Sequence, residues 1–336
     1  MYEVFEHIVI DADQKSKKQA IVNGILEAIH NNELVKGDPL PSVNKFIQKL
    51  GVARMTVVKS LNILKERGII VSEDKVGYYV RDINVKREQK VLLFLTGFYS
   101  YHEILYNSII ENIEGKNIMV DLYFHHCNPR IFRAIINENL GSYGLYVVTG
   151  MEDPQIKSTL QRIPPKKLLQ IIRPPVLDDV STIQQDFFTG VKNSLEKLKE
   201  RLSKYNDFVL IFPEKKGHPQ QIKAAFSEFC TEYGIKHAVR KKLSCDLIKA
   251  ETAFFVIEDS DLISLIKMGD EQHLKQGSEL GILSYNETPM REIIRNGITV
   301  ISVDFVRMGQ SISRFIVNPR STSEIFTPEV IIRNSF

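Results

Sequence analysis

Cysteine is scarce in this sequence, and long apolar runs are missing. The three cysteines, Cys127, Cys230 and Cys245, lie far apart, so neither a disulfide framework nor a four-cysteine zinc site fits. No apolar run approaches the roughly 20 residues that a membrane helix needs. The first residues also lack the charged-then-apolar order of a secretion signal. We therefore expect a cytoplasmic protein with no membrane partner.

Charge of one sign is not in excess either. The 44 basic and 41 acidic residues leave a net charge of +3 over 336 residues, so the composition predicts no broad polyanion-binding surface. The apolar fraction of 43% excludes a wholly disordered chain, and the length allows two or three domains. Any contact with nucleic acid must therefore come from a local patch.

Motifs of catalysis are also missing. The sequence contains no phosphate-cradling glycine loop, no HExxH pair and no GxSxG elbow, so it predicts neither an enzyme nor a cofactor. His125, His126 and Cys127 look like a metal cluster. Adjacent residues of a strand point to opposite faces, however, so we expect no metal there.

The first eighty residues are patterned as helices followed by a hairpin. Apolar spacing predicts three helices, the last over residues 53–67. Gly51 joins the second and third helices in a tight turn, which is the helix-turn-helix outline, and residues 69–71 and 78–80 flank a charged tip. The sequence therefore predicts a winged helix-turn-helix domain over residues 1–82.

Local charge adds to this interpretation. Residues 42–67 contain six basic side chains and one acidic side chain, and such a stripe on a small domain is the electrostatic footprint of phosphate binding. The alternative is a solvated helix face without a partner. The helix-turn-helix outline favours double-stranded DNA.

A polar linker over residues 83–89 leads to strand–helix alternation over residues 90–336. The predicted strands cover residues 91–95, 118–124, 145–148, 168–172, 208–212, 254–257, 280–283 and 299–303. Repeated strand–helix units indicate a doubly wound parallel α/β sheet with helices on both faces. The segment is longer than one such sheet needs, so we expect two lobes. Ligands of these sheets bind at the carboxyl ends of strands, and a site between lobes suits a hinge.

The front of the chain resembles a known regulator family. Residues 34–42 and 50–57, with Leu61, Leu64 and Gly68, resemble the signature of GntR-type transcriptional regulators. The resemblance covers about residues 16–81. It implies a winged-helix DNA-binding domain that acts as a homodimer on an operator.

The same resemblance implies roles for individual residues. Ser42 and Thr56 match positions that bond phosphate oxygens, and Arg54 matches the arginine that begins the recognition helix. Asn44 and Val58 stand where the family has arginines that read guanine edges. Asparagine suits adenine and valine contacts a thymine methyl group, which predicts an unusual operator. Further expected contacts, with phosphates or at the wing, are Lys45, Lys59, Lys75 and Gly77.

Residues 90–336 resemble the sugar-responsive domain of LacI-type repressors, which is similar to periplasmic sugar-binding proteins. Residues 280–288 resemble the family's Gly-Tyr/Phe-Asp-Asp-Thr stretch, residues 298–310 follow as in that family, and residues 324–335 resemble its closing strands. The resemblance implies a two-lobed domain that holds a monosaccharide between its lobes.

Several cleft residues follow from this second resemblance. Asn286 replaces the family's sugar-binding aspartate, Glu258 and Asp259 replace an Asn-Asp pair, and Arg173 ends a strand where a ligand contact or a surface salt bridge would lie. Ile222 stands in place of a family arginine. The remaining candidates are His218, Gln220 and Gln221 as substitutes for that arginine, Phe98, Tyr99, Tyr101 and His102 on the loop after the first strand, and Asp304. Plain packing is the alternative for the tyrosines, and a structural cap is the alternative for Asp304.

Together these features predict a sugar-responsive, dimeric transcriptional regulator, in the role of a repressor of sugar utilisation. A sugar-processing enzyme with a DNA-binding appendage is the alternative from another class, but it would need a convergent acid, base or metal. A third hypothesis keeps the regulator and makes its effector a purine or a sugar phosphate.

Overall fold

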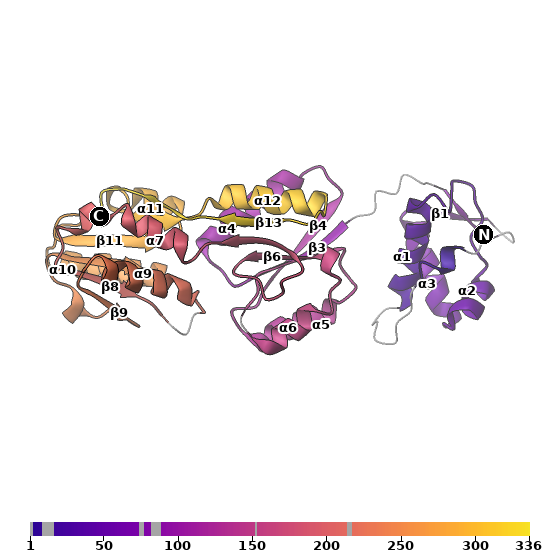
Figure 1. Ribbon diagram of the computed structural model, residues 1–336. Coiled ribbons are helices and arrows are strands. Elements are labelled where there is room, and N and C mark those ends of the chain that lie inside the picture. Colours follow the sequence, from indigo (N-terminus) through magenta and orange to yellow (C-terminus); the bar gives the residue numbers. More distant parts are fainter. Residues whose placement is uncertain (1–2, 9–16, 74–76, 82–88, 152, 214–216) are drawn as a thin grey trace. The chain divides into compact units, whose positions relative to one another are not determined.

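The structure of the chain is a computed structural model that describes residues 3–8, 17–73, 77–81, 89–151, 153–213 and 217–336. They form two compact units, Met1–Gln89 and Lys90–Phe336, each of which can be followed in Figure 1. Residues 82–88, which include residues 83–88 of the predicted linker, lie outside the described ranges, and strand β3 already begins at Gln89.

The first unit is a small helical domain with a hairpin. Its elements are η1 (Glu3–Phe5), α1 (Lys17–His30), α2 (Val43–Leu50), α3 (Arg54–Glu66), β1 (Ile70–Glu73) and β2 (Gly77–Val80). The Ser42 side chain accepts a hydrogen bond from the Lys45 amide and caps α2, which ends at Gly51 in the left-handed conformation (φ 63°). Phe46, Val57, Leu61 and Leu64 are fully buried in one apolar core.

The wing is more than a two-stranded hairpin. β1 and β2 pair antiparallel, with Ile70 opposite Val80. The segment before α2 adds to their edge, because the Leu40 amide donates to the Tyr78 carbonyl (2.8 Å) and the Val80 amide donates to the Asp38 carbonyl (3.0 Å). These bonds anchor the base of the wing beside the start of α2.

The second unit consists of two lobes, each built on a six-stranded sheet. The strand order is β13-β7-β6-β5-β3-β4 in the first lobe and β14-β12-β11-β10-β8-β9 in the second. The first lobe comprises β3 (Gln89–Leu95), α4 (Ser100–Ile113), β4 (Ile118–Phe124), α5 (Pro129–Asn139), β5 (Leu145–Val148), α6 (Pro154–Leu160), η2 (Pro165–Lys167), β6 (Leu168–Ile172), β7 (Ser181–Gln185), α12 (Phe305–Val317) and β13 (Ser323–Phe326). The second comprises α7 (Thr189–Glu196), α8 (Lys199–Leu202), β8 (Asp207–Ile211), α9 (Gln220–Glu232), β9 (His237–Arg240), η4 (Cys245–Leu247), β10 (Thr252–Val256), α10 (Asp259–Glu271), β11 (Leu280–Tyr285), α11 (Pro289–Ile293), η5 (Ile294–Asn296), β12 (Thr299–Ser302) and β14 (Glu329–Ile331).

Helices cover both faces of each sheet. In the first lobe α4 and α12 pack together on one face, and α5 and α6 pack on the other (Figure 1). In the second lobe α7 and α9 contribute to the core on one face, while α10 and η5 pack over the other. Neighbouring strands run parallel where β10 meets β8 and β11, whereas the edge strand β14 is antiparallel to β12.

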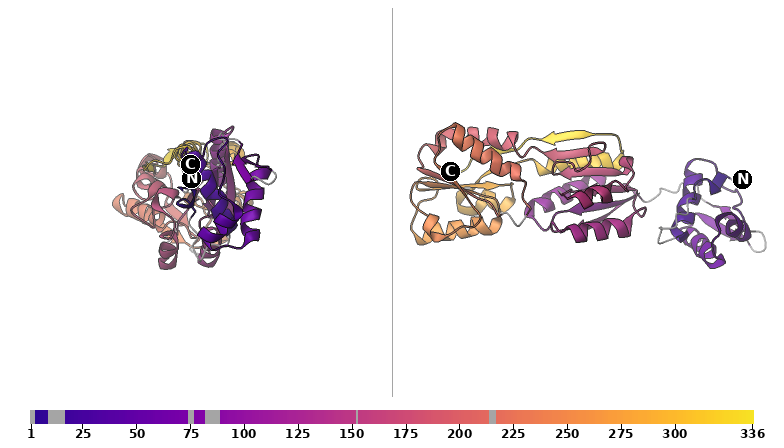
Figure 2. Two further views of the ribbon diagram at one scale, coloured as in Figure 1. Left: turned by 90° about the vertical axis from the view of Figure 1, so that its right-hand side faces the viewer. Right: turned by 60° about the horizontal axis from the view of Figure 1, so that its bottom comes forward.

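The chain passes between the lobes three times, from β7 to α7, from β12 to α12 and from β13 to β14 (Figure 2). Two of these passages touch each other, because the Asp186 amide donates to the Phe326 carbonyl (3.0 Å). A Cβ atom on Gly190 would lie 2.3 Å from Pro328. The passages therefore form a tightly packed hinge between the lobes.

The predicted fold class, a winged helix-turn-helix followed by a doubly wound two-lobed α/β domain, is confirmed. Of the predicted strands, β4, β5 and β6 have the predicted bounds. The prediction omitted β7 and β9. The sequence of β7, STIQQ, has a single strongly apolar residue, and β9 is a short edge strand whose residues are at least partly exposed. Among the helices of the described ranges, none is long and apolar enough to cross a membrane.

Ser335 fastens the C-terminus into the second lobe. Its fully buried hydroxyl donates to the Ile282 carbonyl (2.6 Å) and accepts from the Thr299 amide (2.7 Å), so it bridges β11 and β12. We expect Ser335→Ala to lower the free energy of unfolding of the second unit by about 2 kcal/mol, because two buried backbone groups lose their partner.

The measurement is urea unfolding of the full chain, with the transition of the second unit followed. Ser203→Ala is the control, since the Ser203 hydroxyl bonds the Glu200 carbonyl at an exposed position, and its cost should stay within about 0.5 kcal/mol. Equal losses in the two variants would contradict the bridging role.

Candidate functional site

A cavity of about 480 Å³ lies between the lobes of the second unit. The first lobe lines it with Thr96, Gly97, Phe98, Tyr99, Ser100, Tyr101, His126 and Cys127, and the second lobe lines it with Ile257, Glu258, Asp259, Ser260, Tyr285, Asn286, Thr288 and Arg291. These segments follow or end β3, β4, β10 and β11. The cavity therefore occupies the carboxyl ends of the strands, where ligands of parallel sheets bind, and its size suits a small ligand.

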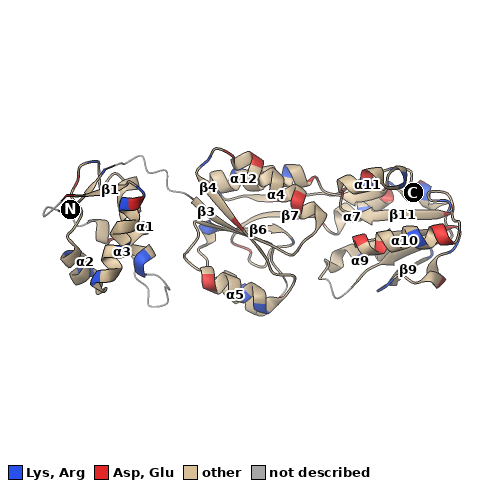
Figure 3. Cartoon of the chain, turned by 180° about the vertical axis from the view of Figure 1, so that it is seen from behind, with Lys and Arg blue, Asp and Glu red and all other residues tan. Residues whose placement is uncertain are grey.

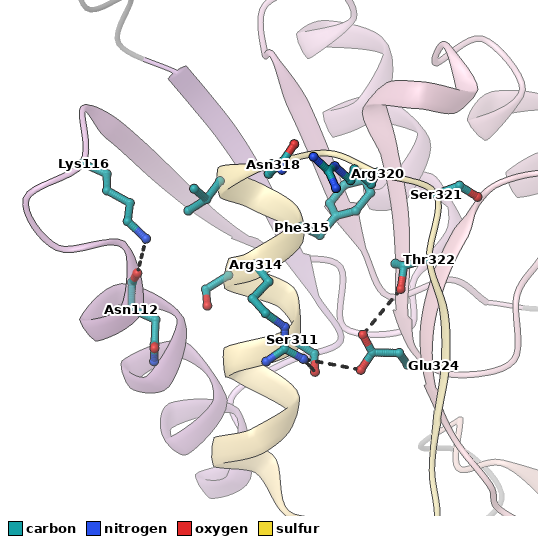
Figure 4. A pocket seen from close by; sticks show the side chains of 12 residues that line it. Asn112, Lys116, Ser311, Arg314, Phe315, Asn318, Arg320, Ser321, Thr322 and Glu324 are labelled. Carbon is teal, nitrogen blue, oxygen red and sulfur yellow. Dashed lines mark hydrogen bonds and ion pairs between the residues drawn. The ribbon is translucent and has the colours of Figure 1, made fainter.

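A second hollow of about 490 Å³ lies on the first lobe, between α4, α12 and the segment before β13 (Figure 4). It sits at the amino ends of β4 and β13. Several of its polar groups already have protein partners: Arg314 donates to the Ser311 hydroxyl (2.6 Å) and lies 3.8 Å from Glu324, and Lys116 donates to the Asn112 carbonyl (2.9 Å). The cavity between the lobes is therefore the candidate site.

Aromatic rings form one wall of this cavity. Tyr101 stacks between Tyr99 (5.5 Å between ring centroids, 14° between planes) and Phe305 (4.8 Å, 26°). Both faces of Tyr101 are thus covered, which fits the packing alternative, and Tyr99 is the terminal ring of the stack. Burial, reinforced by the charge of Glu258, raises the pKa of Tyr99 to about 12, so its hydroxyl stays protonated and can donate.

The opposite wall is organised by a buried guanidinium. Arg291 is only 3% exposed. It donates to Asp259 Oδ1 (2.5 Å), to Ser284 Oγ (3.1 Å) and to Thr288 Oγ1 (3.5 Å). Burial lowers the pKa of Arg291, and the Asp259 carboxylate opposes that shift. The pair fixes Asp259 at the start of α10 while more than half of the Asp259 side chain stays exposed.

Glu258 and His218 make a second close contact in this lobe. His218 Nε2 lies 2.7 Å from Glu258 Oε1, and both side chains are mostly buried. The two atoms do not meet hydrogen-bond geometry, however, and His218 Nε2 has no other hydrogen-bond partner among the described residues. Glu258 lines the cavity, whereas His218 is not among the lining residues.

Asn286 contributes a polar atom that has no hydrogen-bond partner. It directly follows β11 in the left-handed conformation (φ 65°), where asparagine is better tolerated than most residues. Its Oδ1 is buried and accepts no hydrogen bond from the described residues. Buried polar atoms are rarely left unpaired in proteins, so this atom marks a position for a ligand donor.

Arg173 contacts Cys127, which is one of the cavity-lining residues. Arg173 Nη2 donates weakly to Cys127 Sγ (3.7 Å). A Cβ atom on Gly217 would lie 2.8 Å from the same sulfur, so the segment before α9 in the second lobe closely approaches the first lobe here. Arg173 itself is not among the residues that line the cavity.

The other predicted ligand residues are not among the residues that line the cavity. His102 is 3% exposed and its Nδ1 bonds the Gly97 carbonyl (2.8 Å). Gln220 and Gln221 begin α9, whose Ile222 is buried in the core. Asp304 caps α12 by accepting from the Arg307 amide (2.9 Å), as in the structural alternative. Phe98, Tyr99, Tyr101, Glu258, Asp259 and Asn286 all line the cavity.

Sequence analysis missed Arg291, Thr288, His126 and Cys127 as cavity residues. The Asn286-Glu287-Thr288-Pro289 turn after a strand could have indicated Thr288 and Arg291, because an arginine one turn into a helix can reach back to its start. The premise about residues 125–127 was wrong: β4 ends at Phe124, and His126 and Cys127 form a turn at positive φ. In the described ranges, no three His, Cys, Asp or Glu side chains converge as metal ligands.

In the first unit, the candidate DNA-contacting residues lie on α2, α3 and the wing. Lys45 is on α2, Thr56, Val58 and Lys59 are on α3, and Gly77 begins β2 at φ 141°; the basic positions of α2 are blue in Figure 3. Lys75 lies outside the described residues. Met55, 63% exposed on α3, is a further apolar contact candidate that the predicted set omitted.

Two of the residues expected to contact DNA, Asn44 and Arg54, are bonded to each other. Arg54 begins α3 and donates from Nη1 to Asn44 Oδ1 (3.1 Å), and both side chains are exposed. Asn44 thus holds the guanidinium at the amino end of α3. The side-chain oxygen of Asn44 accepts this bond from Arg54, and its NH2 group is the remaining donor for a base.

Two buried histidines behind the aromatic wall predict acid sensitivity. Burial lowers the pKa of His102 to about 4 and that of His125 to about 3, so the folded protein keeps both neutral while the unfolded chain takes up protons below about pH 6.5. Stability is therefore fully present above that pH and falls as the pH drops, by about 2 kcal/mol per histidine between pH 7 and 5.

Urea unfolding at a series of pH values measures this slope. In His125→Asn the free energy of unfolding should fall less steeply with decreasing pH than in the wild type, because one histidine no longer contributes to the slope. This difference in slope does not depend on the absolute stability of the variant. An unchanged slope would contradict the neutral burial of His125.

Comparison with known proteins adds two independent findings. Residues 17–80 match the family described as "Bacterial regulatory proteins, gntR family". Solved structures resemble a part of the chain about as long as the second unit. The trehalose repressor from Escherichia coli superposes with a TM-score of 0.62 at 12% identity, over 73% of this chain and 100% of that one.

Two further structures agree. A LacI family transcriptional regulator from Lactobacillus casei with bound sucrose gives a TM-score of 0.62 at 11% identity, over 74% of this chain and 100% of that one. The dimeric Lac repressor with an 11-residue C-terminal deletion gives a TM-score of 0.61 at 11% identity, over 73% of this chain and 98% of that one. At these identities the likeness shows the fold alone. The chain thus joins a domain that matches the gntR family of bacterial regulatory proteins to a domain with the fold of LacI-family repressors.

Proposed function

We propose that this regulator is a sugar-controlled repressor of a sugar-utilisation operon. Two copies bind a two-fold operator through their winged helices, and a sugar in the cavity between the lobes weakens that binding. The observation that carries the proposal is the buried, unpaired Oδ1 of Asn286, which faces a cavity with an aromatic wall and a carboxylate wall.

The two walls match the two kinds of surface on a sugar ring. The apolar ring face suits Tyr99, the terminal ring of the aromatic stack. Hydroxyl groups suit the carboxylates of Glu258 and Asp259, which accept hydrogen bonds, and the oxygen of Asn286. One monosaccharide unit therefore fits between Tyr99 and the start of α10. The bound sucrose of the Lactobacillus casei regulator is in line with this ligand class.

The hinge supplies the coupling. A ligand that contacts both lobes stabilises one relative position of the lobes, and the packed passages at Asp186, Gly190 and Pro328 must adjust together. Each copy of a dimer would transmit that shift to its winged helix. A coupling free energy of about 1–3 kcal/mol changes operator affinity about 5–150-fold.

Arg54 and Asn44 test the DNA interface. The full-length chain first selects a duplex from a random-sequence library, and fluorescence anisotropy then gives affinities and the number of chains per duplex, expected to be two. Arg54→Ala should weaken binding about 10–100-fold, because the arginine that begins the proposed recognition helix loses its charged contact with DNA. Asn44→Ala should weaken it by a smaller factor of about 2–10, because Arg54 keeps its charge but loses its support.

Arg67→Ala is the matched control, since Arg67 is exposed at the opposite end of α3. It should change affinity less than Asn44→Ala does. If Arg54→Ala binds the selected duplex as tightly as the wild type, α3 is not the recognition helix.

Asn286→Ala tests the ligand site. A thermal-shift screen of monosaccharides and disaccharides, with purines and sugar phosphates included, identifies a ligand, because a ligand that binds only the folded state raises the melting temperature. The variant should bind the selected duplex normally, but it should require at least about tenfold more ligand to release it.

Asn107→Ala, which removes an exposed amide on α4, should respond like the wild type. A full ligand response in Asn286→Ala would exclude this cavity as the control site. A response to purines or sugar phosphates alone would exclude a neutral sugar.

A further inference from the structure

The loop after β3 presents a second aromatic surface that the stacked tyrosines do not use. Phe98 lines the cavity, yet it is 80% exposed, the highest value among the exposed large apolar side chains of the described ranges. Its ring packs against Phe124 (4.2 Å between centroids) and lies 5.6 Å from the ring of His126. We call Phe98, Phe124 and His126 the outer ledge.

The outer ledge is held in place by close backbone packing. Gly97 precedes Phe98, and a Cβ atom there would lie only 3.2 Å from His126 Nδ1. The loop therefore lies directly on the turn formed by His126 and Cys127, both at positive φ. Phe124, at the end of β4, supports the ring of Phe98 from beneath.

The ledge and the tyrosine stack are separate parts of one cavity. Phe98 contacts Phe124 and His126, whereas Tyr99 contacts Tyr101 and His102. Tyr99 has extended backbone angles (φ −114°, ψ 141°), and neighbouring side chains of extended backbone point in opposite directions. One sugar ring can therefore cover Tyr99 or Phe98, but it cannot stack on both.

We propose that the outer ledge is a subsite for a second sugar ring, so that the effector is a disaccharide or longer oligosaccharide. The inference rests on the proposed function, because the first ring occupies the site beside Tyr99 and Asn286. The exposed face of Phe98 receives the apolar face of the second ring. The exposed imidazole of His126 and the Ser260 hydroxyl, both on the cavity lining, bond its hydroxyl groups.

The arrangement accounts for an apolar side chain that would otherwise be left in water. Aromatic side chains bury large areas when they find a partner, and exposed aromatic rings in a polar-rimmed cavity mark binding surfaces. A disaccharide that covers Phe98 gains this contact in addition to those of the first ring. A monosaccharide at the inner site leaves Phe98 exposed.

Isothermal titration of the full-length chain tests the subsite. The probes are sucrose, trehalose, maltose, cellobiose, lactose and melibiose, together with glucose, galactose and fructose. We expect at least one disaccharide to bind about tenfold or more tightly than either of its component monosaccharides. In Phe98→Ala this advantage should fall below about twofold, while the monosaccharide affinity stays within about twofold of the wild type.

Two variants serve as controls. Phe98→Tyr keeps the ring and should keep the disaccharide advantage. Met119→Ala removes an exposed apolar side chain from β4 outside the cavity and should change neither affinity. Because Phe98 is exposed, Phe98→Ala should melt within about 2 °C of the wild type, so that a loss of affinity does not reflect unfolding.

The outcomes separate this proposal from the proposed function. Monosaccharides that bind as tightly as every disaccharide would overturn the second subsite and leave the sugar-controlled regulator intact. Phe98→Ala that weakens both ligand classes equally would also overturn it, since Phe98 would then contact the first ring or the closing lobe. No binding by any probe would overturn the sugar-binding function together with the subsite.

Discussion

The three passages of the chain between the lobes are the constraint on which the site depends. Because β7, β12 and β13 each end in a segment that enters the other lobe, the carboxyl ends of both sheets meet at one cavity. The packed contact of Gly190 with Pro328 leaves no room for a side chain at the hinge. The lobes are thus held close enough to share a ligand and remain joined only by short segments.

Hydrogen bonds and an ion pair around Arg291 determine which polar groups the second lobe presents to the cavity. Arg291 is buried, and a buried charge needs a partner. Asp259, Ser284 and Thr288 supply it, and the pairing orients Asp259 toward the cavity. The first lobe contributes aromatic rings instead. A ligand with apolar and hydroxyl-bearing faces matches this division, whereas in the described ranges a metal or a catalytic cluster finds no set of converging groups.

Much of this architecture could be predicted from sequence because it follows local rules. Ser42, Gly51 and Gly68 mark the ends of helices in the winged domain, and buried strands such as Leu145–Val148 form uninterrupted apolar runs. β7 escaped prediction because polar residues dominate it and its burial depends on neighbours far along the chain.

For the cavity, the ends of strands indicated Asn286 and Glu258, and both residues line it. Arg291, in contrast, reaches the cavity only through the return of α11 toward β11, and the stacking of Tyr101 on Phe305 joins residues two hundred positions apart.

The central claim is that ligand binding between the lobes and DNA binding by the winged helix are coupled, and thermodynamic reciprocity offers the most direct measurement. The affinity of the chain for its sugar is measured by titration with and without a saturating concentration of the selected operator duplex. The account predicts that the operator weakens sugar binding by the same factor, about 5–150-fold, by which the sugar weakens operator binding. Equal sugar affinities with and without the operator would contradict the account.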